Sequence, residues 1–167
     1  MVINKTGRTL PFSCEQLFDL VAEIERYPEF LPGWRSARIN KRAGNTCYVS
    51  QEFALGPLQV QLDSQATLLR PSQIDITSSD PRFRTCRCLL RVLPVEPARC
   101  RLSIEANLVL NSDLLQALLN HVESVSLDSI MAAFEARAHQ LYQDARSHGK
   151  PEVTLRRHAG SARDSEH

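Results

Sequence analysis

A strict two-residue alternation between residues 58 and 68 is the feature that most constrains the fold of this chain. In the run LQVQLDSQATL the even-numbered side chains are apolar except for Ser64, whereas the odd-numbered ones are polar. Successive side chains of a strand point to opposite faces, so this run is typical of a strand with one face in a core and the other in water. It indicates an antiparallel sheet, because parallel sheets are covered on both faces.

The same period recurs along the middle of the chain. Residues 47–55 alternate just upstream, Gly56 and Pro57 form a turn, and shorter runs follow at 74–76, 86–92 and 100–108. Parallel neighbours would need crossovers of about a dozen residues or more, so strands joined by such short turns predict a meander. The expected inward residues are Val49, Phe53, Val60, Leu62, Leu90, Val92, Leu102 and Ile104, with Gln51 and Ser64 as polar interruptions.

Helical patterns flank these strands. Ser13 to Gln16 form a capping box, and apolar residues follow at helical spacing up to Ile24. Near the other end, residues 111–113 supply an N-cap for a helical pattern that runs to about Arg146. Its apolar stripe turns by about 120° between its first and second halves, so either the helix kinks near residues 123–127 or its first turns cover something different.

These patterns together predict an α+β fold. A curved antiparallel sheet of about six or seven strands, counting a weak strand at about residues 2–10, has one face to cover. The long C-terminal helix is the large element left to cover it, so we expect a helix-grip with the sheet wrapped around this helix. Residues 1–146 would form one ligand-binding domain, and the polar residues 147–167, which lack aromatics, a disordered tail.

The segment from Tyr27 to Trp34, YPEFLPGW, holds three aromatic residues and two prolines. Pro28 and Pro32 each lack a backbone N–H and fix their own φ, so we expect a stiff connection that is neither helix nor paired strand. Its apolar members are Tyr27, Phe30, Leu31 and Trp34. They form either a minicore that plugs one end of the sheet or the gate of an apolar cavity. Because Gly33 precedes Trp34, an outward-facing indole would instead make the segment a docking surface.

Charge and composition narrow the function. The net charge is +1, from 20 basic and 19 acidic residues, which leaves no overall field to attract DNA or anionic lipid. No apolar run approaches the roughly 20 residues of a membrane span, and the N-terminus lacks the apolar core of a secretory signal, so a cytoplasmic location is expected. The five cysteines fit neither a metal knuckle nor an even disulfide framework, and we expect them to be reduced and mostly buried as small hydrophobic residues. They are Cys14, Cys47, Cys86, Cys88 and Cys100.

The sequence offers no persuasive catalytic group. It has no Ser/His/Asp arrangement, no metal-ligand spacing and no glycine-rich phosphate loop. His121 is expected on the surface, and Asp63 and Asp75 on outward strand faces. We therefore predict no catalytic residue, no metal site, no cofactor and no enzymatic activity. A basic cluster, Arg82, Arg84, Arg87, Arg91, Arg99 and Arg101, is either a solvated face or a contact for ribosomal RNA or an anionic membrane.

The order of elements, with YPEFLP directly after the first helices and AFEARA at residues 133–138, resembles the coenzyme Q-binding branch of the START-like (polyketide cyclase/dehydrase and lipid transport) superfamily. The resemblance covers about residues 1–145. Bacterial members are often labelled ribosome association toxins, and mitochondrial members are taken to bind ubiquinone and support respiration. The resemblance implies a tunnel between sheet and helix that holds ubiquinone or a similar lipid, with the isoprenoid tail entering first.

On this interpretation the protein is a quinone chaperone of respiration that contacts the inner membrane peripherally. The alternative that the resemblance implies is a ribosome-binding protein that blocks subunit association. The predicted ligand-binding residues are Tyr27, Phe30, Leu31, Trp34, Phe53, Val60, Leu62, Leu90, Leu118 and Val122. Glu135 and Arg137 are expected either on the solvated side of the last helix or as anchors to a neighbouring loop.

Overall fold

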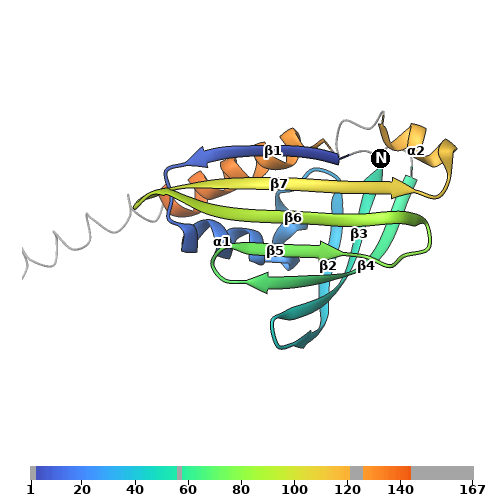
Figure 1. The fold of residues 1–167 in the computed structure, drawn as a ribbon, viewed down its shortest axis with the longest axis horizontal. Helices are drawn as coiled ribbons and strands as arrows, with labels where there is room; N and C mark the ends of the chain where they lie inside the picture. Colours follow the sequence, from blue (N-terminus) through green and yellow to red (C-terminus); the bar gives the residue numbers. More distant parts are fainter. Residues whose placement is uncertain (1–2, 56–57, 121–125, 144–167) are drawn as a thin grey trace, which may run out of the picture.

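One antiparallel sheet dominates the computed structural model, which describes residues 3–55, 58–120 and 126–143. Its strands are β1 (Ile3–Leu10), β2 (Trp34–Ala43), β3 (Thr46–Leu55), β4 (Leu58–Leu69), β5 (Gln73–Thr77), β6 (Phe83–Glu96) and β7 (Arg99–Leu110). They lie in the order β1-β7-β6-β5-β4-β3-β2, so β2 to β7 form the predicted meander and β1 pairs with β7 (Figure 1). The antiparallel sheet expected from the alternation is confirmed.

The pairing of β3 with β4 fixes which side chains face inward. Gln51 lies opposite Leu62, and Val49 lies opposite Ser64. On β4 the side chains of Leu62, Ser64 and Ala66 are buried, whereas those of the intervening odd-numbered residues are exposed. The period-two interpretation of residues 58–68 is therefore correct where the structure describes the side chains.

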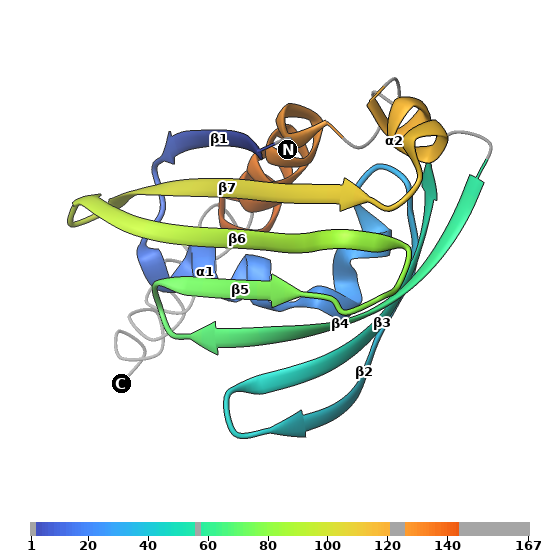
Figure 2. The ribbon, with the colours of Figure 1, turned by 45° about the vertical axis from the view of Figure 1, so that its right-hand side comes forward.

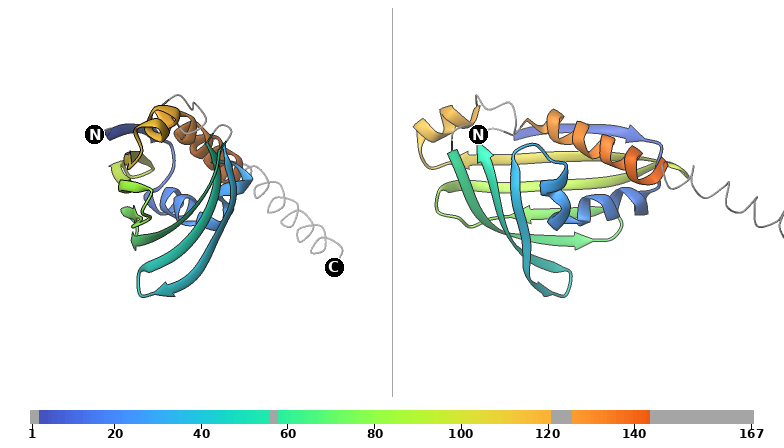
Figure 3. Two further views of the ribbon diagram at one scale, coloured as in Figure 1. Left: turned by 90° about the vertical axis from the view of Figure 1, so that its right-hand side faces the viewer. Right: turned by 180° about the vertical axis from the view of Figure 1, so that it is seen from behind.

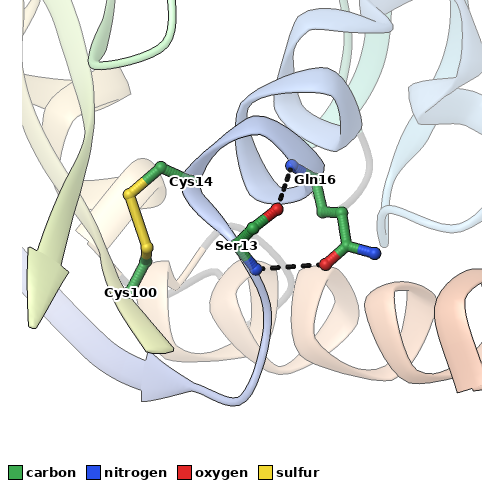
Figure 4. Close-up of a disulfide and its surroundings, with 4 residues drawn as sticks. All are labelled: Ser13, Cys14, Gln16 and Cys100. Carbon is green, nitrogen blue, oxygen red and sulfur yellow. Dashed lines mark hydrogen bonds between the residues drawn. A yellow bond between two sulfur atoms is a disulfide. The ribbon is translucent and has the colours of Figure 1, made fainter. Parts of the chain in front are cut away.

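The first helix, α1 (Cys14–Ala22), begins at the predicted capping box. The Ser13 hydroxyl accepts a hydrogen bond from the Gln16 N–H at 3.2 Å, and the Gln16 side-chain oxygen accepts one from the Ser13 N–H at 3.1 Å (Figure 4). These two bonds satisfy backbone donors that the first turn leaves without helical partners.

A short 3₁₀-helix, η1 (Ile24–Glu29), follows α1 and contains Pro28. The expectation that the aromatic segment is neither helix nor strand is therefore wrong at both of its ends, since Tyr27 to Glu29 belong to η1 and Trp34 begins β2. The proline fits because the hydrogen bonds around it, such as Phe30 N–H to the Tyr27 carbonyl at 3.2 Å, do not need a donor at Pro28.

The predicted continuous helix from residue 113 to about 146 is wrong, whereas the break at Ser126 falls within residues 123–127, where a kink was one of the two alternatives. Helix α2 (Asp113–Asn120) and a second helix over residues 127–143 are separate elements (Figure 2). Ser126 is not helical, and its hydroxyl accepts from the Ser129 N–H at 3.2 Å, so the second helix has its own N-cap. Two helices explain why the apolar stripe changes direction. His121, Val122 and the predicted tail lie outside the described residues.

The sheet curls around the helix over residues 127–143, and α1 lies on the same concave side (Figure 3). Leu17, Phe18 and Val21 of α1 and Met131 and Phe134 of the second helix are at most 1% exposed. They form one core with the inward residues of the strands. The α+β helix-grip is confirmed. No helix among the described residues is long and apolar enough to cross a membrane.

A disulfide joins Cys14 to Cys100 (Figure 4), which corrects the expectation that all five cysteines are reduced. Cys14 is the first residue of α1 and Cys100 lies near the start of β7, and their Cα atoms are 5.7 Å apart. The two residues are separated by 86 positions in the sequence, so only the packing of α1 against the sheet brings them together. Cys47, Cys86 and Cys88 are free.

Candidate functional site

A cavity of about 150 Å³ lies between the concave face of the sheet and the helix over residues 127–143. Its wall is almost entirely hydrocarbon, aromatic or thiol. The lining residues are Tyr27, Leu31, Trp34, Gln51, Phe53, Leu62, Ser64, Ile76, Phe83, Cys86, Cys88, Leu90, Ile104, Ala106, Leu108, Leu127, Ile130 and Phe134.

The cavity occupies only one end of the concave face. Along β7 the wall includes inward residues from Ile104 to Leu108, whereas Leu102 is fully buried in the core. Along β6 the boundary between cavity and solid core falls between Leu90, which lines the cavity, and Val92, which does not. The cavity therefore extends toward the end of β7 that leads into α2, and the solid core lies toward α1.

An aromatic cluster forms one wall. The Tyr27 ring packs edge-on against Phe30 at 6.1 Å, Trp34 at 6.2 Å and Phe134 at 5.6 Å between ring centroids. Its hydroxyl donates to the Val21 carbonyl, and burial raises the pKa of Tyr27. The YPEFLPGW segment thus packs as a minicore, and three of its side chains also line the cavity. The two interpretations left open by the sequence are compatible.

Three polar groups interrupt the apolar wall, and they are hydrogen-bonded in series. The Trp34 indole N–H donates to Gln51 Oε1 at 2.7 Å, and Gln51 Nε2 donates to Ser64 Oγ at 3.3 Å. Gln51 is 7% exposed and Ser64 6%. The indole lies in the cavity wall rather than on the outer surface, so the alternative of an outward-facing Trp34 is excluded.

Two thiols from β6 complete the wall. Burial raises the pKa of Cys86 to about 11 and that of Cys88 to about 12, with smaller contributions from nearby negative groups. Both thiols therefore stay protonated near neutral pH. General acid or base catalysis works best when the pKa of the group lies near the working pH. Within the described part of the wall, Tyr27 and these thiols are the titratable groups, and all three have raised pKa values.

The predicted ligand-binding residues fall into three groups. Those that line the cavity are Tyr27, Leu31, Trp34, Phe53, Leu62 and Leu90. Phe30 and Val60 are partly buried but do not line it; Phe30 packs behind the wall against Phe134 at 5.6 Å. Leu118 belongs to α2, but its side chain is outside the described part of the structure, as is all of Val122. That any of these residues binds a ligand stays a prediction.

Sequence reasoning missed part of the wall. Cys86 and Cys88 share the alternation of β6 and could have been placed by it, but they were interpreted only as small core residues. Leu127, Ile130 and Phe134 come from the second helix at helical spacing. Treating residues 113–146 as one helix assigned the cavity to its first half instead, because Leu118 and Val122 belong to the earlier stripe.

The AFEARA element attaches the helix over residues 127–143 to two other elements. Glu135 accepts from Arg8 of β1 at 2.6 Å. Arg137 lies 3.4 Å from the Glu29 carboxylate, and its guanidinium lies 5.2 Å from the centre of the Phe30 ring. Of the two alternatives for this motif, anchoring is confirmed.

The arginine cluster lies mostly away from the cavity. Arg87 pairs with Asp75 at 2.8 Å on the convex face, and Arg82 pairs with Asp80 at 2.7 Å. Arg91 and Arg101 are exposed. Among the described residues, no group of three or more histidine, cysteine or acidic side chains could hold a metal ion.

Comparison with known proteins identifies the family of this chain. The model for polyketide cyclase / dehydrase and lipid transport proteins matches residues 10–135. This chain belongs to that family. A Vibrio cholerae protein named ribosome association toxin RatA is 24% identical over 131 residues, which cover 78% of this chain and 91% of the relative.

Solved structures share the fold. An aromatase/cyclase from a Streptomyces species superposes with a TM-score of 0.74 at 13% identity, covering 83% of this chain and 94% of the other. An 18 kDa protein from Caulobacter crescentus superposes with a TM-score of 0.66 at 26% identity, covering 86% and 99%. Proteins similar to this chain thus carry names for different roles, such as aromatase/cyclase and ribosome association toxin, so similarity alone does not assign a function.

Proposed function

We propose that this protein binds a hydrophobic isoprenoid lipid, most specifically ubiquinone, and carries or presents it to respiratory enzymes without changing it chemically. The observation that carries the proposal is the cavity wall. It is apolar apart from the Trp34, Gln51 and Ser64 groups, and its described titratable groups stay protonated near neutral pH. Such a wall favours apolar molecules and offers them no acid or base.

The size of the cavity limits how much of the ligand it holds. A cavity of about 150 Å³ in an engineered protein holds one benzene ring, whereas pockets for drug-sized ligands measure about 300–1,000 Å³. The cavity here, also about 150 Å³, fits one ring or a short chain segment. The remainder of an isoprenoid lipid would extend beyond the described wall.

The proposed location is the cytoplasm, with peripheral contact at the inner membrane where such a lipid resides. The Cys14–Cys100 disulfide counts against a cytosolic location, because structural disulfides are rare in the reducing cytosol. Cell fractionation tests the location. The protein is expected in the cytosolic fraction and in the salt wash of the membranes. Recovery only from an exported fraction would contradict the proposed location.

The protein carries its own probe for binding. Trp34 is the single tryptophan of the chain and lies in the cavity wall. Titration with decylubiquinone, a short-tailed quinone, should quench Trp34 fluorescence in a saturable manner. Quenching that stays linear and unsaturated would refute binding at this site.

A cavity-filling variant separates binding from collisional quenching. Ala106 lines the cavity, so Ala106→Phe would occupy space that the ligand needs. Glu105→Phe adds the same side chain to the neighbouring residue on the convex face and serves as the control. Saturable quenching should be lost in Ala106→Phe and kept in Glu105→Phe, with folding of both checked by circular dichroism.

Ribosome binding is the second candidate, favoured by similarity to the Vibrio cholerae ribosome association toxin RatA and by the exposed arginines on the convex face. We propose that Arg91 and Arg101 would contact the RNA backbone, since neither forms an ion pair within the described residues. Cosedimentation with ribosomal subunits tests it. Arg91→Glu/Arg101→Glu should abolish cosedimentation and Ala106→Phe should not; no cosedimentation of the unaltered protein would exclude the function.

A further inference from the structure

The polar groups of the cavity lie at its inner end. Gln51 on β3 and Ser64 on β4 line the cavity, whereas the next inward residues toward the core, Val49 and Ala66, are at most 1% exposed and do not line it. On the other side, Phe53 and Leu62 continue the wall with apolar side chains. A ligand in the cavity would therefore meet the amide of Gln51 and the hydroxyl of Ser64 at the inner end of the cavity.

The hydrogen bonds among these groups run in one direction. An indole N–H can only donate, so Trp34 fixes Gln51 Oε1 as the acceptor and leaves Gln51 Nε2 as the donor toward Ser64. Ser64 Oγ thus accepts, and its own O–H remains as a donor. Within the residues that the structure describes, Ser64 donates no hydrogen bond, although it is 6% exposed. A buried donor without an acceptor favours a ligand that supplies one.

We propose that the Ser64 hydroxyl, oriented by Gln51 and Trp34, donates a hydrogen bond to a neutral oxygen acceptor on the ligand, such as a ring carbonyl. The inference rests on the proposed function and gives the bound lipid a direction. The polar ring lies at the inner end beside Ser64, and the apolar tail points toward the α2 end of the cavity. This is the reverse of the tail-first entry implied by the family resemblance.

The same wall selects against a charged head group. A carboxylate at this depth would need a cationic partner, because burying an unpaired charge is far more costly than burying a carbonyl. The described lining residues include no lysine, arginine or histidine. A neutral quinone or ketone therefore fits, whereas a fatty acid does not.

Calorimetric titration of the full chain with three probes tests the proposal. Decylubiquinone carries the ring carbonyls, decylbenzene has a ring and tail without oxygen, and decanoate carries a charge. Ser64→Ala should weaken decylubiquinone binding about tenfold, the equivalent of one hydrogen bond, and leave decylbenzene unchanged. Ser64→Thr keeps the hydroxyl and should retain the affinity. Ser50→Ala, which removes a hydroxyl from the opposite face of β3, is the control.

Infrared difference spectra of bound decylubiquinone give a second measurement. In the unaltered protein, one carbonyl stretch of bound decylubiquinone should lie at a lower frequency than in the free quinone. In Ser64→Ala it should return to the frequency of the free quinone. Equal affinity of Ser64→Ala and unaltered protein for decylubiquinone, or decanoate binding as tightly as the quinone, would overturn the head-inward assignment while leaving lipid binding intact. If neither decylubiquinone nor decylbenzene binds the unaltered protein, lipid binding itself fails, and the assignment fails with it.

Discussion

Gly33 directs the Trp34 indole into the cavity. It has φ +85°, a left-handed conformation that glycine adopts without a steric penalty. Its carbonyl accepts from the Ala54 N–H at 2.8 Å, which holds the start of β2 against β3. From the sequence, Gly33 left open whether the Trp34 indole faces outward; in the structure this residue allows the turn that places the indole beside Gln51.

Gly33→Ala should therefore destabilise the protein and disturb the site together. The left-handed conformation costs an L-residue about 1–2 kcal/mol, and the new Cβ would lie 3.2 Å from the Ala54 carbonyl oxygen. Gly44 is the matched control, since its φ is +60° but a Cβ there meets nothing within 4 Å. Urea unfolding should show the larger loss for Gly33→Ala, and Trp34 emission should shift only in that variant. Equal losses and unchanged emission would contradict this role.

The cavity thiols should react slowly with alkylating reagents. With their pKa values raised to about 11 and about 12, Cys86 and Cys88 are almost entirely protonated near neutral pH, and the thiolate is the reactive form. In a Cys47→Ser background we expect iodoacetamide to label them much more slowly than it labels the urea-unfolded chain. Labelling at the same rate in both states would show that the wall is open to solvent.

The same shifts set a pH dependence of stability. A thiol that ionises at higher pH when folded confers stability that is complete below its unfolded pKa of about 9 and is lost as the pH rises toward about 11. The free energy of unfolding should therefore fall across this alkaline range. Cys86→Ser/Cys88→Ser should show a smaller fall; an identical slope would contradict the shifts.

At the scale of elements, the last helix depends on side-chain anchors as well as on its apolar stripe. Arg137 contacts both Glu29 and the Phe30 ring and is only 18% exposed. Arg137→Ala should lower the free energy of unfolding by about 1 kcal/mol, because it removes a partly desolvated cation–π contact and an ion pair. Arg26→Ala removes a more exposed partner of the same Glu29 and should lower the free energy of unfolding in urea by less than Arg137→Ala does. Equal losses of unfolding free energy in Arg137→Ala and Arg26→Ala would show that Arg137 contributes only through its ion pair with Glu29.

The disulfide ties α1 to β7 and closes a loop across most of the sheet. For a separation of 86 residues, loss of the bond should lower stability by about 4.6 kcal/mol, chiefly by freeing the unfolded chain. Thermal unfolding of Cys14→Ser/Cys100→Ser should show this loss, and dithiothreitol should reproduce it in the unaltered protein but not in the variant. A melting temperature that dithiothreitol leaves unchanged would show that the bond contributes nothing.

Local patterns predicted every strand except β2, together with the capping box and the inward parity of β3, β4, β6 and β7, because each depends on neighbouring residues. The helix-grip followed from their order. Two features depend on contacts between distant residues and could not be predicted: the Cys14–Cys100 pair and the series from Trp34 through Gln51 to Ser64. The change of direction in the last apolar stripe indicated a kink near residues 123–127, but not that Ser126 begins a separate helix. The alternation placed Gln51 and Ser64 inward but could not show that the indole joins them.

At the scale of the whole molecule, the concave face is divided into a solid half and a hollow half. The solid half, under α1, holds the disulfide and the fully buried core residues Leu17, Phe18 and Leu102. The hollow half lies toward α2 and is lined by the aromatic cluster and the thiols. This division explains how the fold can leave space for a ligand, since stability is concentrated where the cavity is absent.

The most direct test of the account is the lipid that the protein carries from the cell. Protein purified without detergent is extracted with organic solvent, and the extract is analysed by mass spectrometry beside those of Ala106→Phe and Glu105→Phe. We predict a neutral isoprenoid quinone from the unaltered protein and from Glu105→Phe, and none from Ala106→Phe. An extract without lipid, or equal amounts of quinone from Ala106→Phe, would contradict a lipid-binding cavity between the sheet and the helix over residues 127–143.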